Sequence, residues 1–233
     1  AAGGLGLMSY YLSSWLNFEG LRYVSAQLER LILYIYPTMV ALMSWAFLKD
    51  RITRRHVIAL VLAYAGVAIL FGAEIGHQGP DAWLGGGLIF AGAFIYAVYV
   101  TASKPVIRRL GPTMFTAFGM SIASIAFLTH SGIEMVFHAP PPVTANGYWL
   151  ALTLAIFCTV IPSFMIAEAI SRIGPGPMSA VGGIGPVVAA WAAVAILNEP
   201  FGWPHAAAMA LTIAGVWLLA RPKLTRTAGA RTW

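Results

Sequence analysis

Eight long stretches of the chain carry few or no charged side chains, and this pattern constrains the fold more than any other feature. A helix needs about 20 apolar residues to cross the hydrocarbon core of a bilayer, where every backbone polar group must find its partner inside the protein. The stretches cover residues 5–20, 28–48, 56–73, 82–103, 113–133, 147–169, 178–197 and 205–220. Charged residues with proline or glycine, which end helices, separate them. The sequence therefore predicts an all-α bundle of about eight transmembrane helices.

The composition leaves no room for a water-soluble domain. Hydrophobic residues make up 59% of the chain and charged residues 9%, whereas a soluble domain has about 25% charged residues. The formal net charge of +6 comes from short basic tracts between apolar stretches. Such tracts indicate membrane loops better than a nucleic-acid surface, so we expect a bilayer and no nucleic acid as partner. Cys158 is the single cysteine, which excludes an intrachain disulfide.

The distribution of basic residues predicts an orientation, because cytoplasmic loops collect Lys and Arg. If eight helices alternate in direction, twelve of the 14 basic residues fall on one side. The loops on the other side hold Glu74, Asp81, Glu134 and Glu199 with only Arg22. We therefore expect both ends of the chain, including a tail at 221–233, in the cytoplasm, and the inner (plasma) membrane of a bacterium as the location.

The chain contains an internal repeat. A shift of 149 residues aligns 37–70 with 186–219 without a gap, and the identical pairs include Pro37/Pro186 and Gly66/Gly215. By the predicted orientation, loop 49–55 is cytoplasmic while its counterpart 198–204 lies on the opposite side. The two copies are thus expected to be inverted, which is typical of secondary transporters with a substrate site near the membrane midplane.

Short motifs in both copies resemble one known family. The first copy has Leu21-Arg22-Tyr23-Val24-Ser25-Ala26, Tyr36-Pro37, Phe47-Leu48-Lys49-Asp50-Arg51-Ile52-Thr53 and Ala65-Gly66-Val67. The second has Arg172-Ile173-Gly174-Pro175, Gly185-Pro186, Leu197-Asn198-Glu199-Pro200 and Ala214-Gly215-Val216. Together they resemble the EamA-type branch of the drug/metabolite transporter superfamily.

The resemblance implies ten helices in two inverted five-helix repeats, and this chain matches from the third helix onward. We therefore expect residues 1–73 to be the last three helices of a truncated first repeat. Residues 82–220 would then form the five helices of the second repeat. Part of the wall of a central cavity would be missing from such a chain.

Ionisable residues inside membrane helices are costly and are candidates for function. Glu29 and Arg30 open the second apolar stretch, and Arg30, Tyr34 and Pro37 follow near-helical spacing. Arg30 is expected to attract an anionic substrate group or to pair with Glu29. The alternative is an interfacial charge that reaches the lipid headgroups.

A second candidate group lies on the first helix. Tyr11, Trp15 and Glu19 recur every four residues and share one face, which suits an amphipathic ligand. The 149-residue shift pairs Glu19 with Glu168, so symmetric carboxylates are candidates for cation binding or proton coupling. The alternative is that both mark helix ends, and for Glu168 the nearby Arg172 favours it.

Aromatic residues and prolines complete the candidates. Tyr96, Tyr99 and Trp191 are candidates to line the cavity, with packing or an interfacial aromatic belt as the alternative. Pro37, Pro162 and Pro186 are candidate hinges, with simple kinks as the alternative.

Other features predict packing and the absence of metal. Small residues such as Gly85, Gly92 and Ala210 let helix backbones approach closely, within one chain or between copies, so homo-oligomer formation stays open. The five histidines show no metal-binding spacing, and we expect no metal or other cofactor.

Together these patterns favour a secondary transporter, an exporter or facilitator that moves small metabolites or amphipathic, cationic compounds by alternating access. The alternatives are a non-transporting scaffold subunit and a membrane-embedded enzyme on a lipid-linked substrate. The enzyme is disfavoured because no nucleophile elbow or phosphate-binding loop is present.

Overall fold

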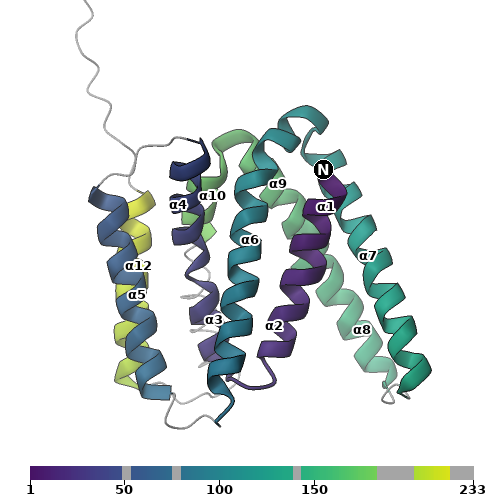
Figure 1. The fold of residues 1–233 in the computed structure, drawn as a ribbon, viewed down its shortest axis with the longest axis horizontal. Helices are drawn as coiled ribbons and strands as arrows, with labels where there is room; N and C mark the ends of the chain where they lie inside the picture. The colour runs from purple at the N-terminus through teal and green to yellow at the C-terminus, as the bar shows by residue number, and fades with distance from the viewer. Residues whose placement is uncertain (49–53, 75–79, 139–142, 183–201, 221–233) are drawn as a thin grey trace, which may run out of the picture.

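A computed structural model describes residues 1–48, 54–74, 80–138, 143–182 and 202–220, and within these residues every regular element is a helix. Figure 1 shows the helices side by side in one bundle. Three of the described helical segments are long and apolar enough to cross a membrane, namely Ala82–Leu110, Pro112–Phe137 and Ala145–Ile173. The predicted all-α transmembrane bundle is confirmed.

The first two apolar stretches differ in continuity. The first is one rod formed by α1 (Ala2–Gly6), the π-helical segment η1 (Leu7–Ser13) and α2 (Ser14–Gly20). The second is divided into α3 (Ala26–Leu33) and α4 (Tyr36–Leu48), because Pro37 has no N–H to continue the bonding of α3. The third stretch is α5 (Arg54–Glu74).

The fourth helix is longer than its apolar stretch. We predicted a break from residue 104 onward, but α6 (Ala82–Leu110) continues through Pro105 and ends only before Gly111. A helix of 29 residues is about 43 Å long, which exceeds the hydrocarbon core, so Arg108 and Arg109 extend into the headgroup region. Charge alone therefore did not end this helix.

Two Gly-Pro pairs lie at the same end of the bundle, and at each pair one helix ends and the next begins. Gly111 has φ 78° and Gly174 has φ 87°, a left-handed conformation that favours glycine. Pro112 then opens α7 (Pro112–Phe137) and Pro175 opens α10 (Pro175–Gly182), positions where the missing N–H costs nothing.

The remaining helices complete the bundle. The sixth pass consists of α8 (Ala145–Thr153), the π-helical segment η3 (Leu154–Val160) and α9 (Ile161–Ile173). The last described helix is α12 (Trp203–Ala220). The loops 49–55 and 198–204, on which the predicted inversion rests, lie mostly outside the described residues.

Helix α6 occupies the middle of the bundle (Figure 1) and supplies much of the core. Its fully buried Ala97 and Val100 belong to one cluster with Val40 of α4 and with Ala167 and Ile170 of α9. This packing brings the helices on either side of α6 into one hydrophobic core.

Glycines set the closeness of three helix contacts, as the sequence predicted for Gly85 and Gly92. A Cβ on Gly85 would meet the carbonyl oxygen of Gly20 at 2.9 Å, and one on Gly92 would meet Oδ1 of Asn17 at 2.7 Å. A Cβ on Gly6 of α1 would overlap the backbone of Gly119 on α7. The first rod therefore packs on α6 and α7 at backbone contact distance.

The 149-residue shift aligns α5 (Arg54–Glu74) with α12 (Trp203–Ala220), and Figure 1 shows these helices side by side. The π segments η1 and η3 begin at Leu7 and Leu154, 147 residues apart (154 − 7). The sequence did not predict either π segment.

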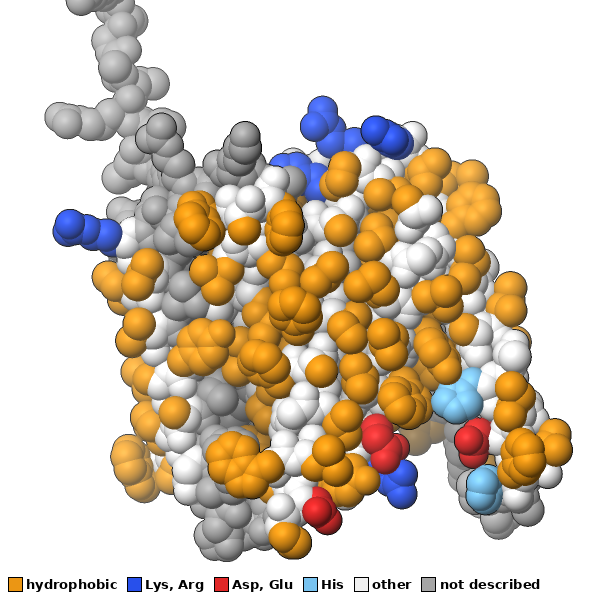
Figure 2. Space-filling view, viewed as in Figure 1, with side chains coloured by type: hydrophobic (Ala, Val, Ile, Leu, Met, Phe, Trp, Pro, Cys, Tyr) orange, Lys and Arg blue, Asp and Glu red, His pale blue; other side chains and the backbone are white. Residues whose placement is uncertain are grey.

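The surface is apolar on its sides and polar at its two ends. Figure 2 shows orange side chains over the middle, most Lys and Arg at the upper end, and acidic and histidine side chains at the lower end. α8 and η3 contain no buried residue. The segment formed by α8 and η3 is therefore exposed along its whole length, and we call it the bare arm.

Candidate functional site

Four tyrosines from three helices meet inside the bundle. Tyr96 and Tyr99 share one face of α6, and the hydroxyl oxygens of Tyr99 and Tyr10 of η1 lie 3.0 Å apart. The ring of Tyr36, the first residue of α4, lies edge-on to Tyr96 with centroids 5.2 Å apart. Phe115 of α7 stacks on Tyr99 at 5.9 Å. We call Tyr10, Tyr36, Tyr96, Tyr99 and Phe115 the tyrosine cluster.

Two members of the tyrosine cluster lie halfway along their helices, whereas Phe115 lies in the first turn of α7. Tyr96 is the fifteenth of the 29 residues of α6, and Tyr10 is near the middle of the first rod, from Ala2 to Gly20. Because a helix rises evenly along its axis, Tyr10 and Tyr96 are expected near the midplane of the bilayer. Phenol groups at that depth are removed from both aqueous surfaces.

Buried polar atoms without a partner also occur in the bundle. Among the described residues, Oγ1 of Thr101, Oγ1 of Thr116, Oγ of Ser44 and Oδ1 of Asn17 accept or donate no hydrogen bond. Thr116 follows Phe115 on α7, and Thr101 lies two residues after Tyr99 on α6, spacings that direct these side chains to other faces of their helices. Because an unpaired buried polar group costs free energy, such groups mark where a polar ligand or water can bind.

The helix break beside the tyrosine cluster coincides with a predicted hinge. Pro37 lies in the first turn of α4, and the chain bridges from α3 with short turns in which Ile35 N donates to Ile32 O and Thr38 N to Ile35 O, each at 3.1 Å. Pro162 lies in the first turn of α9, directly after η3. Pro186 lies outside the described residues. Whether these prolines act as hinges stays a prediction.

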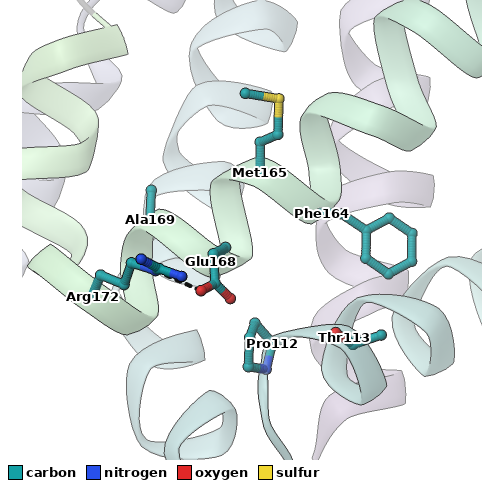
Figure 3. A pocket seen from close by; sticks show the side chains of 7 residues that line it. All are labelled: Pro112, Thr113, Phe164, Met165, Glu168, Ala169 and Arg172. Atoms are coloured by element: carbon teal, nitrogen blue, oxygen red, sulfur yellow. Dashed lines mark hydrogen bonds and ion pairs between the residues drawn. The ribbon is translucent and has the colours of Figure 1, made fainter.

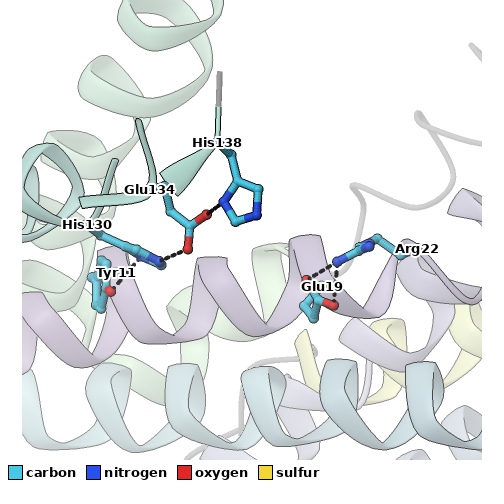
Figure 4. Close-up of polar contacts among 6 residues, drawn as sticks. All are labelled: Tyr11, Glu19, Arg22, His130, Glu134 and His138. Atoms are coloured by element: carbon cyan, nitrogen blue, oxygen red, sulfur yellow. Dashed lines mark hydrogen bonds and ion pairs between the residues drawn. The ribbon is translucent and has the colours of Figure 1, made fainter. Parts of the chain in front are cut away.

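The predicted face of Tyr11, Trp15 and Glu19 points away from the tyrosine cluster. The hydroxyl of Tyr11 lies 2.9 Å from Nδ1 of His130 on α7 (Figure 4), and the ring of Trp15 lies 6.5 Å from the same imidazole. Glu19 turns to the adjacent loop and accepts two hydrogen bonds from Arg22, at 2.9 and 3.1 Å. This bond and the carboxylate charge raise the pKa of Arg22 above its ordinary value.

The sequence analysis did not identify the partners of Tyr11. His130, Glu134 and His138 recur every four residues on α7, and Glu134 lies 3.9 Å from His130 and 3.4 Å from His138 (Figure 4). The spacing was visible in the sequence, but the approach of residue 11 to residue 130 depends on helix packing. This group, with Tyr11, is the outer polar cluster.

The remaining candidates lie elsewhere. Glu29 and Arg30 are half-buried on α3, form no ion pair with each other, and have no described contact with the tyrosine cluster. Tyr34 lies in the turn between α3 and α4. Glu168 accepts a hydrogen bond from Nε of Arg172 at 2.6 Å on the outer face of α9. Trp191 lies outside the described residues.

In the described part of the chain, no group of three or more His, Cys, Asp or Glu side chains is arranged to hold a metal ion. The tyrosine cluster offers hydroxyls and aromatic faces in place of strong ligands. Tyr99 and Phe115 belong to the buried hydrophobic core, and Tyr10, Tyr36 and Tyr96 pack against it.

The long apolar helices define a helical membrane protein. The EamA-like transporter family matches residues 1–72 and 83–221. The chain therefore belongs to this family, and the resemblance found in its motifs is confirmed.

Relatives carry the same general description. The chain is 29% identical over 210 residues to "Uncharacterized transporter YcbK" of Bacillus subtilis (strain 168), which covers 86% of this chain and 65% of the relative. It is 28% identical over 224 residues to "Uncharacterized transporter YcxC" of the same organism, covering 91% and 70%. The chain thus spans about two thirds of the length of these relatives. It spans 64% of the length of a third relative, "Uncharacterized transporter YetK" of the same organism.

A solved structure, "Crystal structure of protein", shares the fold. It matches with a TM-score of 0.73 and 20% identity over 92% of this chain and 74% of the other. At this identity the match supports the architecture alone.

Proposed function

We propose that this chain carries a small amphipathic or cationic metabolite across the bilayer by alternating access, as an exporter or facilitator. The observation that carries the proposal is the hydrogen bond between Tyr10 and Tyr99 at mid-membrane depth. It joins a helix of the first repeat to a helix of the second. A site between inverted repeats at this depth can open toward either side in turn.

The chemistry of the tyrosine cluster favours a substrate class. Aromatic rings attract organic cations through their faces, and the hydroxyls of Tyr10 and Tyr99 fix a polar group. A lipophilic amine or a similar metabolite combines both requirements.

The repetition itself is supported by conformation as well as sequence. A π segment occurs in the first rod and again in the sixth pass, as two copies of one unit would show. The basic end of the bundle (Figure 2) supports a cytoplasmic location for both chain ends.

The bare arm α8–η3 supports a further element of the proposal. η1 and α2 are covered by α6 and α7, whereas the equivalent η3 has no buried residue. We propose that two helices outside this sequence cover η3 in the complete transporter, and that they close the cavity wall. The same bare arm would also suit a scaffold subunit that docks on another membrane protein.

Flux measurements test the proposal. The chain, alone and joined to the upstream residues of its gene, is reconstituted in liposomes, and uptake of amino acids, nucleosides and cationic dyes is measured. Tyr99→Phe is compared with Tyr148→Phe, a control on the exposed α8. Flux that exceeds empty vesicles and falls only in Tyr99→Phe supports the proposal. Flux equal to empty vesicles in both forms would favour the scaffold, and turnover of a lipid-linked substrate would favour the enzyme.

A further inference from the structure

A pocket of about 510 Å³ lies between the start of α7 and α9, away from the tyrosine cluster. Figure 3 shows Pro112 and Thr113 of α7 on one side and Phe164, Glu168 and Arg172 of α9 on the other. The core-facing residues of α9 are Ser163, Ala167 and Ile170. Since these lie on the opposite face of the helix, the pocket opens outward from the bundle.

The pocket lies at headgroup level. Arg108 and Arg109 occupy the last turn of α6, just before the Gly111-Pro112 turn that forms one wall, and Arg172 occupies the last turn of α9. Basic side chains at helix ends reach the polar surface of a bilayer. A molecule bound here has one end among lipid headgroups.

The opposite side of the pocket leads into the apolar region. Met114 and Phe118 of α7 and Ile161 and Met165 of α9 are exposed. On α9, Ile161 and Met165 share one face with Glu168 and Arg172, and Ile161 and Arg172 are eleven residues apart, so this exposed face extends about 16 Å toward the bilayer centre. Its length and character suit the first carbons of an acyl chain.

The only charged groups among the lining residues form one ion pair. Nε of Arg172 donates to Oε1 of Glu168 at 2.6 Å, and the two Nη groups have no other bond in the described part of the chain. The pair adds no net charge. A ligand with both a phosphate and an amine complements it, because the phosphate binds the Nη groups and the ammonium binds the free carboxylate oxygen.

We propose that this pocket binds an aminophospholipid, phosphatidylethanolamine, from the leaflet at the basic end of the bundle. Its phosphate binds Arg172, its ammonium binds Glu168, and an acyl chain lies along Met165 and Ile161. A purely anionic lipid is disfavoured because the carboxylate of Glu168 repels it. The site is separate from the tyrosine cluster and does not depend on transport.

Lipid selectivity in nanodiscs tests this site. The chain is exchanged into nanodiscs of equal parts phosphatidylethanolamine and phosphatidylglycerol, and lipids retained after detergent release are counted by native mass spectrometry. The wild type retains phosphatidylethanolamine several-fold over phosphatidylglycerol. Arg172→Gln weakens this retention roughly tenfold, and Glu168→Gln shifts the preference toward phosphatidylglycerol. The matched control Arg109→Gln, at the same end but outside the pocket, retains the wild-type preference.

Two further arms separate the lipid from other ligands. Met165→Trp fills the mouth of the pocket without touching the ion pair, and it displaces the lipid while the thermal unfolding temperature is unchanged. Glycerophosphoethanolamine and inorganic phosphate, which lack acyl chains, compete only weakly. Competition by either at lipid-like concentration would mean that the pocket binds a soluble phosphate compound. Equal retention by wild type, Arg172→Gln and Met165→Trp would remove the site altogether.

Discussion

The hydroxyl oxygens of Tyr10 and Tyr99 lie 3.0 Å apart although the residues are 89 positions apart in the chain. Their rings meet at an interplanar angle of 66°, so the contact is both polar and aromatic. Among the described residues, these two form the one hydrogen bond that joins a side chain of the first rod to a side chain of α6. Loss of this hydrogen bond would therefore affect both the stability of the bundle and the polar groups of the tyrosine cluster.

Loss of one hydroxyl from this pair is expected to weaken the bundle. Tyr99→Phe leaves the hydroxyl of Tyr10 without its partner, at a cost of about 1 kcal/mol. The thermal unfolding temperature in detergent should fall by a few degrees, while Tyr148→Phe on the exposed surface leaves it unchanged. Equal unfolding temperatures for both variants would show that the bond contributes no stability.

Close backbone contact between α1 and α7 gives a second prediction. Gly6→Ala places a methyl group against the backbone of Gly119, and we expect a loss of about 1–3 kcal/mol from overpacking. Gly4→Ala is the matched control, since a Cβ there meets nothing within 4 Å. Circular dichroism melts of the two variants provide the measurement. A Gly6→Ala protein as stable as Gly4→Ala would contradict the packing.

The single cysteine reports on the bare arm. Cys158 lies on η3 and is exposed. In this chain, a lipid-soluble maleimide should label it readily. When the two proposed helices are added to the chain, they should slow labelling about tenfold because they cover η3. Equal rates in both proteins would show that lipid covers this arm.

The orientation is tested with single cysteines placed in a Cys158→Ser background. Arg109→Cys lies at the basic end of the bundle and His138→Cys at the other. A membrane-impermeant maleimide added to intact cells should label only position 138, and position 109 should react only after the cells are opened. Labelling of Arg109→Cys from outside would reverse the proposed orientation.

The outer polar cluster is expected to hold the distal half of α7. Most residues of α7 beyond Ala123 are exposed, and Tyr11 is bonded to His130. His130→Ala should therefore increase hydrogen exchange in the last turns of α7, while the first turns, packed on α1, stay protected. His138→Ala, whose described contact is with Glu134 on the same helix, serves as the control. Unchanged exchange in His130→Ala would show that ring packing alone holds the helix.

The sequence predicted the class of fold well because its signals are local. Apolar stretches, Gly-Pro pairs and basic ends each act within one helix, and they identified the passes. Pro105 was misread as a helix end, since a proline near the end of a long helix loses only one hydrogen bond there.

The candidate site was only partly predictable for the opposite reason. Tyr96 and Tyr99 were identified, but Tyr10 was missed because only the face of Tyr11, Trp15 and Glu19 was considered on the first helix. Tyr11 and Trp15 do share one face, and both lie beside His130. The approach of His130 to Tyr11 depends on the packing of distant helices, which no local pattern encodes.

The π segment η1 gives two neighbouring residues separate tasks. Tyr10 reaches Tyr99 at the middle of the bundle, and Tyr11 reaches His130 toward the outer end. Since both rings are carried by adjacent backbone units, any turn of η1 about its own axis displaces them together. The contact at the buried centre and the contact toward the outer surface are therefore expected to change together.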